Sequence, residues 1–471
     1  MNISHLDTII IIFFIVSTLV LGFIKTDGLK GINAFALGRR SPSTKALTST
    51  IIATWASGSG FMVTLSETYF EGWYYLIPSL CMCLSLVIVA IVIVPRMQDF
   101  VGRTTVASTM GKIYGKKVRF ITALAGAIGV SGSIAVQFKV CGNIGHEMFG
   151  YSRELFIICM GTIIIWYSIV GGVESVIKTD IIQMAAFSIA LPIVLLMIYL
   201  TFAENHFMEF TKVDKFNLSH VFGTYDPKIL DMVLLGLYFA IPSMNPATVQ
   251  RVSMGLSMNQ VKKAWLTAAI VLFIIELLSA FLPVYIYTIN PNLKEGEILG
   301  FIINNFTLPG IRGLLAVGII AMGMSTADSY LNISSVLIAN DLWKANTLDN
   351  ADKLLNARKF TIIIGIIAIT AAIYGGSFLK IILFTNSFYM PIVTVPLLFT
   401  IFNYKTSARC VLIAMLLAFI VVCWFHVSKL FELSSINIDP IIPGMAVNAI
   451  TLVICTKLFY KGHITEGQKI T

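Results

Sequence analysis

The sequence predicts an all-α integral membrane protein with about thirteen transmembrane helices. Of its 471 residues, 57% are hydrophobic and only 12% are charged, and the mean hydropathy is +0.86. An ordinary soluble domain carries roughly 25% charged residues. Apolar runs long enough to cross a bilayer also recur along the whole chain. These observations exclude a soluble protein, and we expect the lipid bilayer to be its main partner.

Thirteen apolar runs follow one another along the chain, and each is expected to form one transmembrane helix. Their centres lie near residues 15, 57, 85, 128, 162, 190, 240, 276, 324, 366, 390, 416 and 450. The first run is not typical of a cleaved signal peptide, because residues 1–7 contain no Lys or Arg and no small-residue cleavage site follows. The seven cysteines lack metal-binding spacing, so we interpret them as buried apolar residues.

The distribution of basic residues predicts the orientation of the chain. With an external N-terminus and thirteen crossings, the cytoplasmic loops and tail contain 24 of the 33 Lys and Arg residues, and the external loops contain 7. Cytoplasmic loops of membrane proteins are enriched in Lys and Arg. The split therefore predicts a cytoplasmic C-terminus in a bacterial-type inner membrane. The same rule explains the net charge of +9 without a nucleic-acid partner.

Sequence motifs of nucleotide-driven pumps and common hydrolases are absent. There is no Gly-rich phosphate-binding loop with its Lys-Ser/Thr, no HExxH pair and no paired catalytic carboxylates. We therefore expect a protein that is not an enzyme, that uses no organic cofactor, and for which no partner protein is implied.

A polar stripe interrupts the apolar run at about residues 311–338. Ser325, Asp328, Ser329 and Asn332 share one helix face, because their spacings are three, one and three. Such a stripe inside a membrane is costly unless it faces a cavity or a bound ion, and its oxygen atoms suit a hard cation such as sodium. The alternative is a polar seam between helices, which the carboxylate of Asp328 makes less favourable.

Two apolar runs contain residues that break helices at mid-membrane depth. Residues 55–60 read WASGSG and residues 242–246 read PSMNP. Glycine and proline weaken helices and free backbone carbonyls, which can bind substrate and ions when they line a cavity. The breaks lie five spans apart, as in transporters with inverted five-helix repeats. Each break alone also fits ordinary close packing or a kink.

Four segments resemble the sodium:solute symporter family, which includes bacterial proline, sialic acid and galactose symporters. FALGRRS at residues 35–41 is similar to the stretch after the first helix of the family. GGVESVIKTDIIQ at 171–183 resembles its GG-x7-TD-x2-Q signature, NPATVQR at 245–251 its NP-x3-QR segment, and STADS at 325–329 an element of its proline-type branch. The resemblance covers nearly the whole chain.

The resemblance implies a leucine-transporter-like inverted five-helix repeat core within a single transmembrane domain. Residues 1–43 would form the leading helix and loop, residues 44–402 the ten-helix core, and residues 403–471 two trailing helices and the tail. It also implies sodium as the coupling ion, held between the broken first core helix and the eighth core helix. Carried over by position, the sodium ligands are the carbonyls of Ala53, Ala56 and Met322 and the hydroxyls of Ser325 and Thr326.

The resemblance places a second cation site at Asp180, Asp328 and Ser329. Some relatives have serine at the position of Asp328, so the coupling ratio stays open. Asp328 either binds a second sodium or titrates and carries a proton.

Substrate residues are assigned to the broken helices and the fourth span. These candidates are Trp55, Ser57, Ser59, Gly60, Gln137, Tyr238 and Ile241. Lys139 either pairs with a substrate carboxylate or extends to the outer end of its helix. Because Gln137 and Lys139 point about 200° apart on a helix, we do not expect them to share one pocket. Glu276 is interpreted as a helix–helix contact.

The functional hypothesis is sodium-coupled secondary active symport of a small polar organic solute by alternating access. An amino acid, a sugar acid, another carboxylate and a vitamin all fit this description. Proton coupling in the same fold is the alternative. A channel is less consistent with discontinuous helices in inverted repeats, and a sensor is less consistent with the short tail after Lys461.

Overall fold

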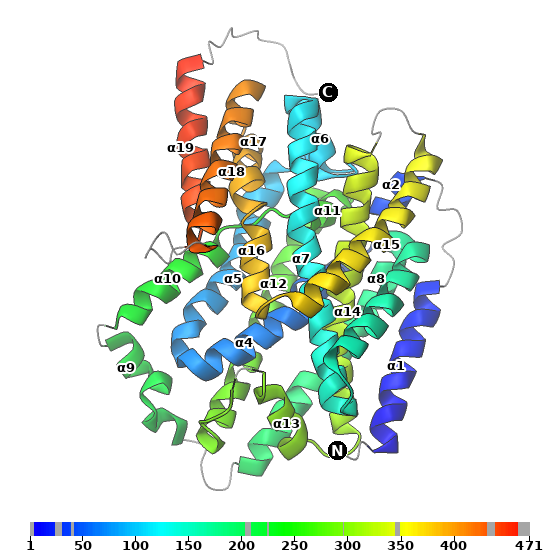
Figure 1. Ribbon diagram of the computed structural model, residues 1–471, viewed down its shortest axis with the longest axis vertical. Helices are drawn as coiled ribbons and strands as arrows, with labels where there is room; N and C mark the ends of the chain where they lie inside the picture. Colours follow the sequence, from blue (N-terminus) through cyan, green and yellow to red (C-terminus); the bar gives the residue numbers. More distant parts are fainter. Residues whose placement is uncertain are drawn as a thin grey trace.

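The computed structural model describes residues 4–23, 31–38, 42–202, 209–223, 226–294, 296–343, 349–430 and 439–459. Regular structure in these ranges is entirely helical. The last three positions of the FALGRRS motif and the tail from Lys461 lie outside the described residues. Figure 1 shows most long helices aligned along one axis, as expected for a chain that crosses a membrane repeatedly.

The α-helices follow the predicted apolar runs in chain order. They are α1 (His5–Phe23), α2 (Ile32–Leu37), α3 (Thr44–Trp55), α4 (Gly58–Glu71), α5 (Leu76–Ile88), α6 (Val106–Tyr114), α7 (Lys116–Phe149), α8 (Arg153–Phe202), α9 (Leu218–Gly223), α10 (Pro227–Ala240), α11 (Pro246–Ser253), α12 (Met258–Ile289), α13 (Ile298–Phe306), α14 (Ile311–Leu337), α15 (Asn350–Tyr374), α16 (Phe378–Asn386), α17 (Val395–Ile401), α18 (Ala408–Leu430) and α19 (Ile441–Phe459).

By length and hydropathy, ten helical segments in the described residues can cross a membrane. This number is lower than thirteen partly because α8 counts once although it joins two helices that meet at a kink at Gly172 and cover the apolar runs near residues 162 and 190. The first of two broken pairs, α3 and α4, consists of pieces of 12 and 14 residues, and the second, α10 and α11, of pieces of 14 and 8. The count of thirteen spans stays a prediction.

Both predicted helix breaks are present, and each restarts with a capped helix. The chain leaves α3 at Ala56, and the hydroxyl of Ser57 accepts a hydrogen bond from the N–H of Gly60 at 3.0 Å. At the second break Met244 has a positive φ of 46°, and the side chain of Asn245 accepts from the N–H of Thr248 at 2.9 Å. Such caps satisfy orphan N–H groups at a helix start. The glycines of WASGSG lie after the break, inside α4.

A kink at Gly172 divides α8 within the GG signature. Its backbone has φ 58° and ψ −165°, a conformation that is essentially restricted to glycine. A Cβ atom here would lie 2.9 Å from Cδ2 of Phe35 and 3.1 Å from its carbonyl oxygen. Beyond the kink, the hydroxyl of Ser175 donates to the carbonyl of Gly22 at 2.9 Å, which joins α8 to α1. The kink thus sets the direction of the part of α8 that carries Asp180.

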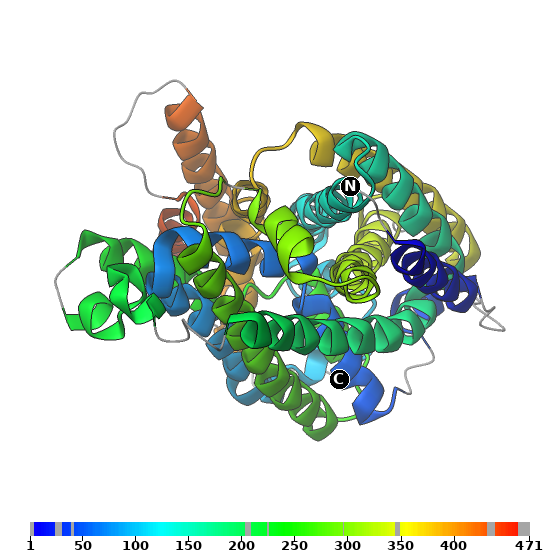
Figure 2. The same cartoon turned by 90° about the horizontal axis from the view of Figure 1, so that it is seen from below.

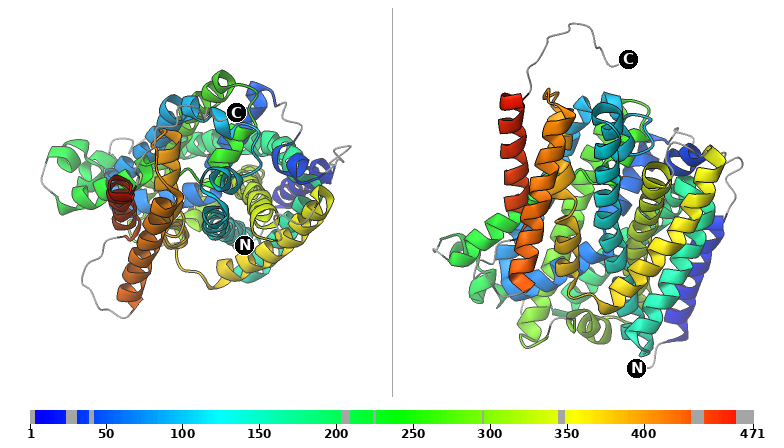
Figure 3. Two further views of the ribbon diagram at one scale, coloured as in Figure 1. Left: turned by 90° about the horizontal axis from the view of Figure 1, so that it is seen from above. Right: turned by 45° about the horizontal axis from the view of Figure 1, so that its top comes forward.

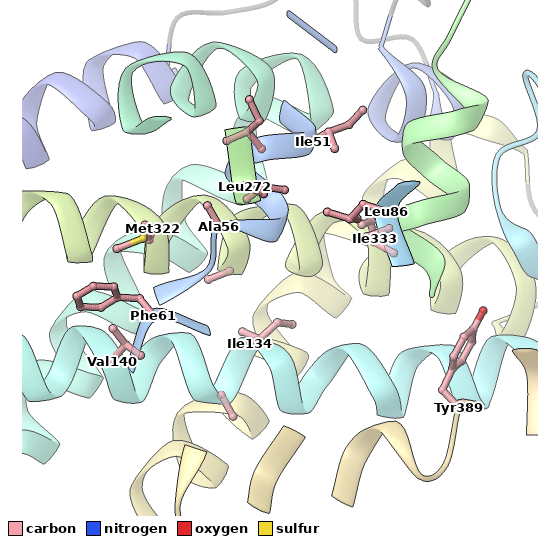
Figure 4. Packing of buried hydrophobic residues seen from close by; sticks show 14 of the residues in the cluster. Ile51, Ala56, Phe61, Leu86, Ile134, Val140, Leu272, Met322, Ile333 and Tyr389 are labelled. Atoms are coloured by element: carbon pink, nitrogen blue, oxygen red, sulfur yellow. The ribbon is translucent and has the colours of Figure 1, made fainter. Parts of the chain in front are cut away.

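Helix α14 occupies the centre of the bundle. It packs against α1, α3, α4, α7, α8 and α15. Figure 2 shows α1, α7, α8 and α15 next to it. In its most apolar window 94% of the residues are buried, whereas the value for α1 is 28%. Ala56 of the first break and Met322 of α14 belong to one apolar cluster with Phe61 and Val140 (Figure 4). The polar stripe of α14 therefore faces protein, not lipid.

The start of α1 and the end of α19 lie on opposite sides of the bundle. Helix α1 begins on the side that carries α9 and α13, and α19 ends on the side that carries α6 (Figure 1). Helices α18 and α19 pack against each other at the edge of the bundle (Figure 3).

Near α9, the ammonium of Lys215 lies 3.5 Å from the centre of the Tyr287 ring and donates to the carbonyl of Tyr69 at 2.7 Å. Burial lowers the pKa of Lys215 to about 8.

Candidate functional site

A central cavity of about 160 Å³ lies at the two helix breaks. Ser57 of the first break and Asn245 of the second line it, and residues of α5, α7, α12, α14 and α16 complete the wall. Aromatic and aliphatic side chains alternate there with hydroxyl and amide groups. This mixture is typical of a site for a small polar molecule.

Most of the predicted substrate residues line this cavity. They are Trp55, Ser57, Ser59, Gly60 and Gln137. The carboxamide of Gln137 accepts a hydrogen bond from the N–H of Ser59 at 3.2 Å and donates one to its hydroxyl at 2.7 Å. The indole of Trp55 packs edge-on against Trp265 of α12, with ring centroids 4.8 Å apart. The structure thus joins the first break to α7 and α12 around one space.

Three other residues considered for substrate lie elsewhere. Tyr238 and Ile241 do not line the cavity, although the Tyr238 hydroxyl accepts a hydrogen bond from the lining residue Asn386 at 3.0 Å. Lys139 lines a separate cavity of about 240 Å³, where its ammonium donates to the carbonyls of Gly375 at 3.1 Å and Gly376 at 2.5 Å. Gln137 and Lys139 therefore face different spaces, as their helical spacing predicts.

Oxygen atoms predicted to bind sodium converge between α3 and α14. The hydroxyl of Thr326 lies 3.4 Å from the carbonyl oxygen of Ala53, 3.5 Å from that of Thr54 and 3.1 Å from that of Met322. Thr54 was absent from the predicted ligands, although it belongs to the same helix turn. Ala56 is the C-terminal cap of α3. These hard oxygen donors fit a sodium ion, and the helix break makes the carbonyls available.

The hydroxyl of Ser325 contacts the signature carboxylate. It donates to Asp180 Oδ1 at 2.5 Å, while Thr50 of α3 donates to Asp180 Oδ2 at 2.5 Å. All three side chains are fully buried. Asp180 thereby connects α8 to both helices that supply the predicted sodium ligands.

Asp328, one helical turn from Ser325, has a different set of partners. Its Oδ2 accepts hydrogen bonds from the hydroxyls of Tyr167 at 2.8 Å and Thr179 at 3.5 Å. Its Oδ1 is buried and receives no hydrogen bond from the described residues. Because a buried carboxylate oxygen is costly without a donor or a cation, this orphaned acceptor fits a cation ligand.

Arg251 is a site residue that the sequence reasoning missed. It lies between the apolar runs centred near residues 240 and 276, which the predicted topology makes a cytoplasmic loop, but in the structure it belongs to α11 and has no exposed surface. Its Nη2 donates to Ser329 at 2.7 Å and to Thr54 at 2.9 Å, and lies 4.0 Å from Asp180 Oδ2. The sequence did contain one signal. Arg251 belongs to the NP-x3-QR segment, which directly follows a helix break and resembles a family motif.

Glu276 of α12 makes the helix–helix contact that the sequence suggested, and it also lines the central cavity. Its Oε2 accepts hydrogen bonds from Thr64 of α4 at 2.9 Å and Ser79 of α5 at 3.2 Å. The expectation was therefore incomplete. A predicted contact between helices does not show whether the residue also borders a cavity.

Comparison with known proteins relates these features to a family. The model of the sodium:solute symporter family matches residues 35–418. The sodium/sialic acid symporters NanT of Aliivibrio fischeri and SiaT of Proteus mirabilis are each 24% identical to the chain over 359 residues; these alignments cover 72% of this chain and 70% and 72% of theirs. The solved outward-open structure of a Na⁺-coupled sialic acid symporter has a TM-score of 0.83 at 19% identity, covering 97% of this chain and 98% of that one. This likeness confirms the predicted leucine-transporter-like fold.

Proposed function

Since the chain belongs to the sodium:solute symporter family, we propose that its central cavity binds the solute and that α3 and α14 hold the coupling sodium beside it. The protein is a sodium-coupled symporter for a small polar organic solute, not an enzyme. One observation carries the assignment of the site. The cavity lies at both helix breaks, and Thr326 lines it while its hydroxyl also contacts the carbonyls at the end of α3.

The first sodium site consists of the carbonyls of Ala53, Ala56 and Met322 and the hydroxyls of Ser325 and Thr326. Support comes from the short distances between Thr326 and two of these carbonyls. Sodium bound here would link α3 to α14, next to Ser57 and the cavity. Binding of sodium and solute would then favour the same arrangement of the two helices, which is the basis of coupled transport.

A second cation site consists of Asp180, Asp328 and Ser329. Two buried carboxylates lie in this region, and among the described residues the structure gives them one ion-pair partner, Arg251. Since buried charges require compensation, one further positive charge is needed. The orphaned Oδ1 of Asp328 supports its position. We favour sodium as the occupant, because Ser325 and Ser329 supply additional oxygen atoms, and a proton on Asp328 is the alternative.

The protein is a multi-pass membrane protein, and we place it in a bacterial inner membrane with an external N-terminus and a cytoplasmic C-terminus. The excess of Lys and Arg in the predicted cytoplasmic loops supports this orientation. The positions of the start of α1 and the end of α19 on opposite sides of the bundle are consistent with it.

Uptake into proteoliposomes tests the proposal. Purified protein would be reconstituted and supplied with labelled amino acids, sugar acids, monocarboxylates and vitamins, with an inward sodium gradient or with choline in place of sodium. We expect saturable accumulation of one solute class with sodium only. Trp55→Ala should abolish this uptake, whereas Trp424→Ala on the exposed surface of α18 should not. Equal loss in both variants would contradict the assignment of the cavity.

A further inference from the structure

Glu276 places a carboxylate on the wall of the central cavity, and neither the sodium sites nor the solute site proposed above includes this residue. Among the described residues that line the cavity, it is the only one with a charged side chain. It lies on α12 and takes no part in either proposed cation site. A carboxylate in an apolar helix is expensive to retain in a membrane protein, and such residues are by default functional.

The surroundings of Glu276 hold its carboxylate in place but leave it incompletely paired. Thr64 and Ser79 both donate to the same atom, Oε2, at 2.9 and 3.2 Å. The described residues provide no hydrogen bond to Oε1. The side chain is therefore oriented by two neighbouring helices, and one of its oxygen atoms is available to a bound molecule.

The nearby basic side chains are engaged elsewhere. Lys139 lines the separate cavity and donates to two backbone carbonyls. Arg251 is bonded to Thr54 and Ser329. Neither lines the central cavity, so no basic side chain on the cavity wall would offset the carboxylate of Glu276 for an anionic solute. Charges inside a small cavity surrounded by a medium of low dielectric constant attract or repel each other strongly.

Aromatic rings on the cavity wall also favour a cationic solute. Trp55, Tyr75 and Phe239 line the cavity together with Glu276. The faces of aromatic rings attract cations, and a carboxylate combined with aromatic rings is a suitable environment for an ammonium group.

We propose that Glu276 selects solutes that carry an ammonium or another cationic group and excludes those whose only charge is a carboxylate. This inference rests on the proposed function of the central cavity and specifies its substrate class. It also separates this chain from the two relatives named for sialic acid, which is a carboxylic acid. The Oε1 atom would accept a hydrogen bond from the cationic group, while Gln137 and Ser59, which also line the cavity, would bind other polar atoms of the solute.

Two sets of size-matched solutes test the charge preference. The first set is glucosamine, glucose and glucuronate, and the second is 6-aminohexan-1-ol, hexane-1,6-diol and 6-hydroxyhexanoate. Sodium-dependent binding to the purified protein would be measured by calorimetry. In at least one set we expect the ammonium-rich member to bind about tenfold or more tightly than the anionic member, the order given by one charged hydrogen bond. Equal or reversed affinities in both sets, or no binding of either cationic solute, would overturn the proposal.

Variants of Glu276 distinguish selectivity from a structural role. Glu276→Gln keeps the shape and can still accept from Thr64 and Ser79, so it should fold but lose the difference between cationic and anionic solutes. Glu276→Asp should retain the preference, and Glu154→Gln on the exposed surface of α8 should leave it unchanged. A Glu276→Gln protein with wild-type selectivity, or with changed sodium activation and unchanged selectivity, would contradict the assignment.

The same samples separate this inference from the proposed function. Sodium alone should raise the Tm of the wild-type protein in the absence of solute, because it binds the folded state at α3 and α14. If sodium stabilises the protein but the charge preference is absent, only the role of Glu276 fails. If sodium has no effect on Tm, the proposed sodium site itself is wrong.

Discussion

The hydroxyl of Thr326 is the side-chain group most directly placed to bind sodium, because it lies within 3.5 Å of three backbone carbonyls. Replacing Ser325 and Thr326 together by alanine removes two hydroxyl ligands. The sodium concentration for half-maximal uptake should rise tenfold or more if each ligand contributes about 1.5 kcal/mol. Ser334→Ala provides the control, since this buried hydroxyl of α14 donates to the carbonyl of Tyr330. Sodium activation that is identical in all three proteins would exclude the site.

Asp328 distinguishes coupling to a second sodium from coupling to a proton. If it binds sodium, wild-type uptake should show a sodium Hill coefficient above one, and Asp328→Ala should bring that coefficient towards one. If it carries a proton, uptake should respond to an imposed pH gradient, and Asp328→Asn should abolish the response. Asp231→Asn, an exposed carboxylate on α10, is the matched control. A variant Asp328→Asn with wild-type Hill coefficient and no pH effect would reduce this carboxylate to a structural role.

At the scale of single helices, Gly172 sets the direction of the part of α8 that carries Asp180. Gly172→Ala combines backbone strain of about 1–3 kcal/mol with a Cβ atom 2.9 Å from Phe35. Gly150→Ala also places alanine at a positive φ, 72°, but a Cβ atom there meets nothing within 4 Å. We therefore expect Gly172→Ala to lower Tm clearly more than Gly150→Ala, and to weaken sodium activation through Asp180. Equal losses of Tm in a thermal unfolding assay would argue against the packing role.

The sequence predicted helices better than it predicted their contacts. Composition and apolar runs gave the helical class, and WASGSG and PSMNP gave both breaks, because glycine, proline and capping residues act locally. Local patterns could not show that the first break lies at Ala56 and Ser57. They also could not place Arg251, whose burial depends on partners from α3, α8 and α14 that are far away in the sequence.

The same limit applies to the candidate site. The stripe of α14 was predictable because four polar residues share one helical face. Helical geometry predicted that Gln137 and Lys139 face different spaces, because it gives the relative directions of their side chains. Ile241 follows the end of α10, where the direction of a side chain depends on backbone angles that no regular period supplies, and Tyr238 lies in α10, whose rotation about its own axis depends on packing against other helices. Glu276 could be recognised as unusual, but only packing shows that it lines a cavity.

For the whole molecule, the orientation in the membrane can be tested by labelling single cysteines in a background without native cysteines. A cysteine at Lys116, exposed at the start of α7, should react with a membrane-impermeant maleimide only from the cytoplasmic side. A cysteine at Asn292, exposed between α12 and α13, should react only from outside. Lys215 is a poorer position, because its ammonium is held against Tyr287 and Tyr69. The reverse pattern of labelling would invert the proposed topology.

The contact between Trp55 and Trp265 also allows the occupancy of the cavity to be followed by tryptophan fluorescence. Trp55 lines the cavity, whereas Trp265 is fully buried, and the two indoles meet edge-on at 4.8 Å. A solute that enters the cavity must replace water beside one indole of this pair, so the intrinsic fluorescence of the protein should change in proportion to occupancy. Trp55→Phe should remove most of that signal, while Trp343→Phe, at an exposed position, should preserve it. The protein would then report its own binding curve without any radioactive or chemically labelled solute.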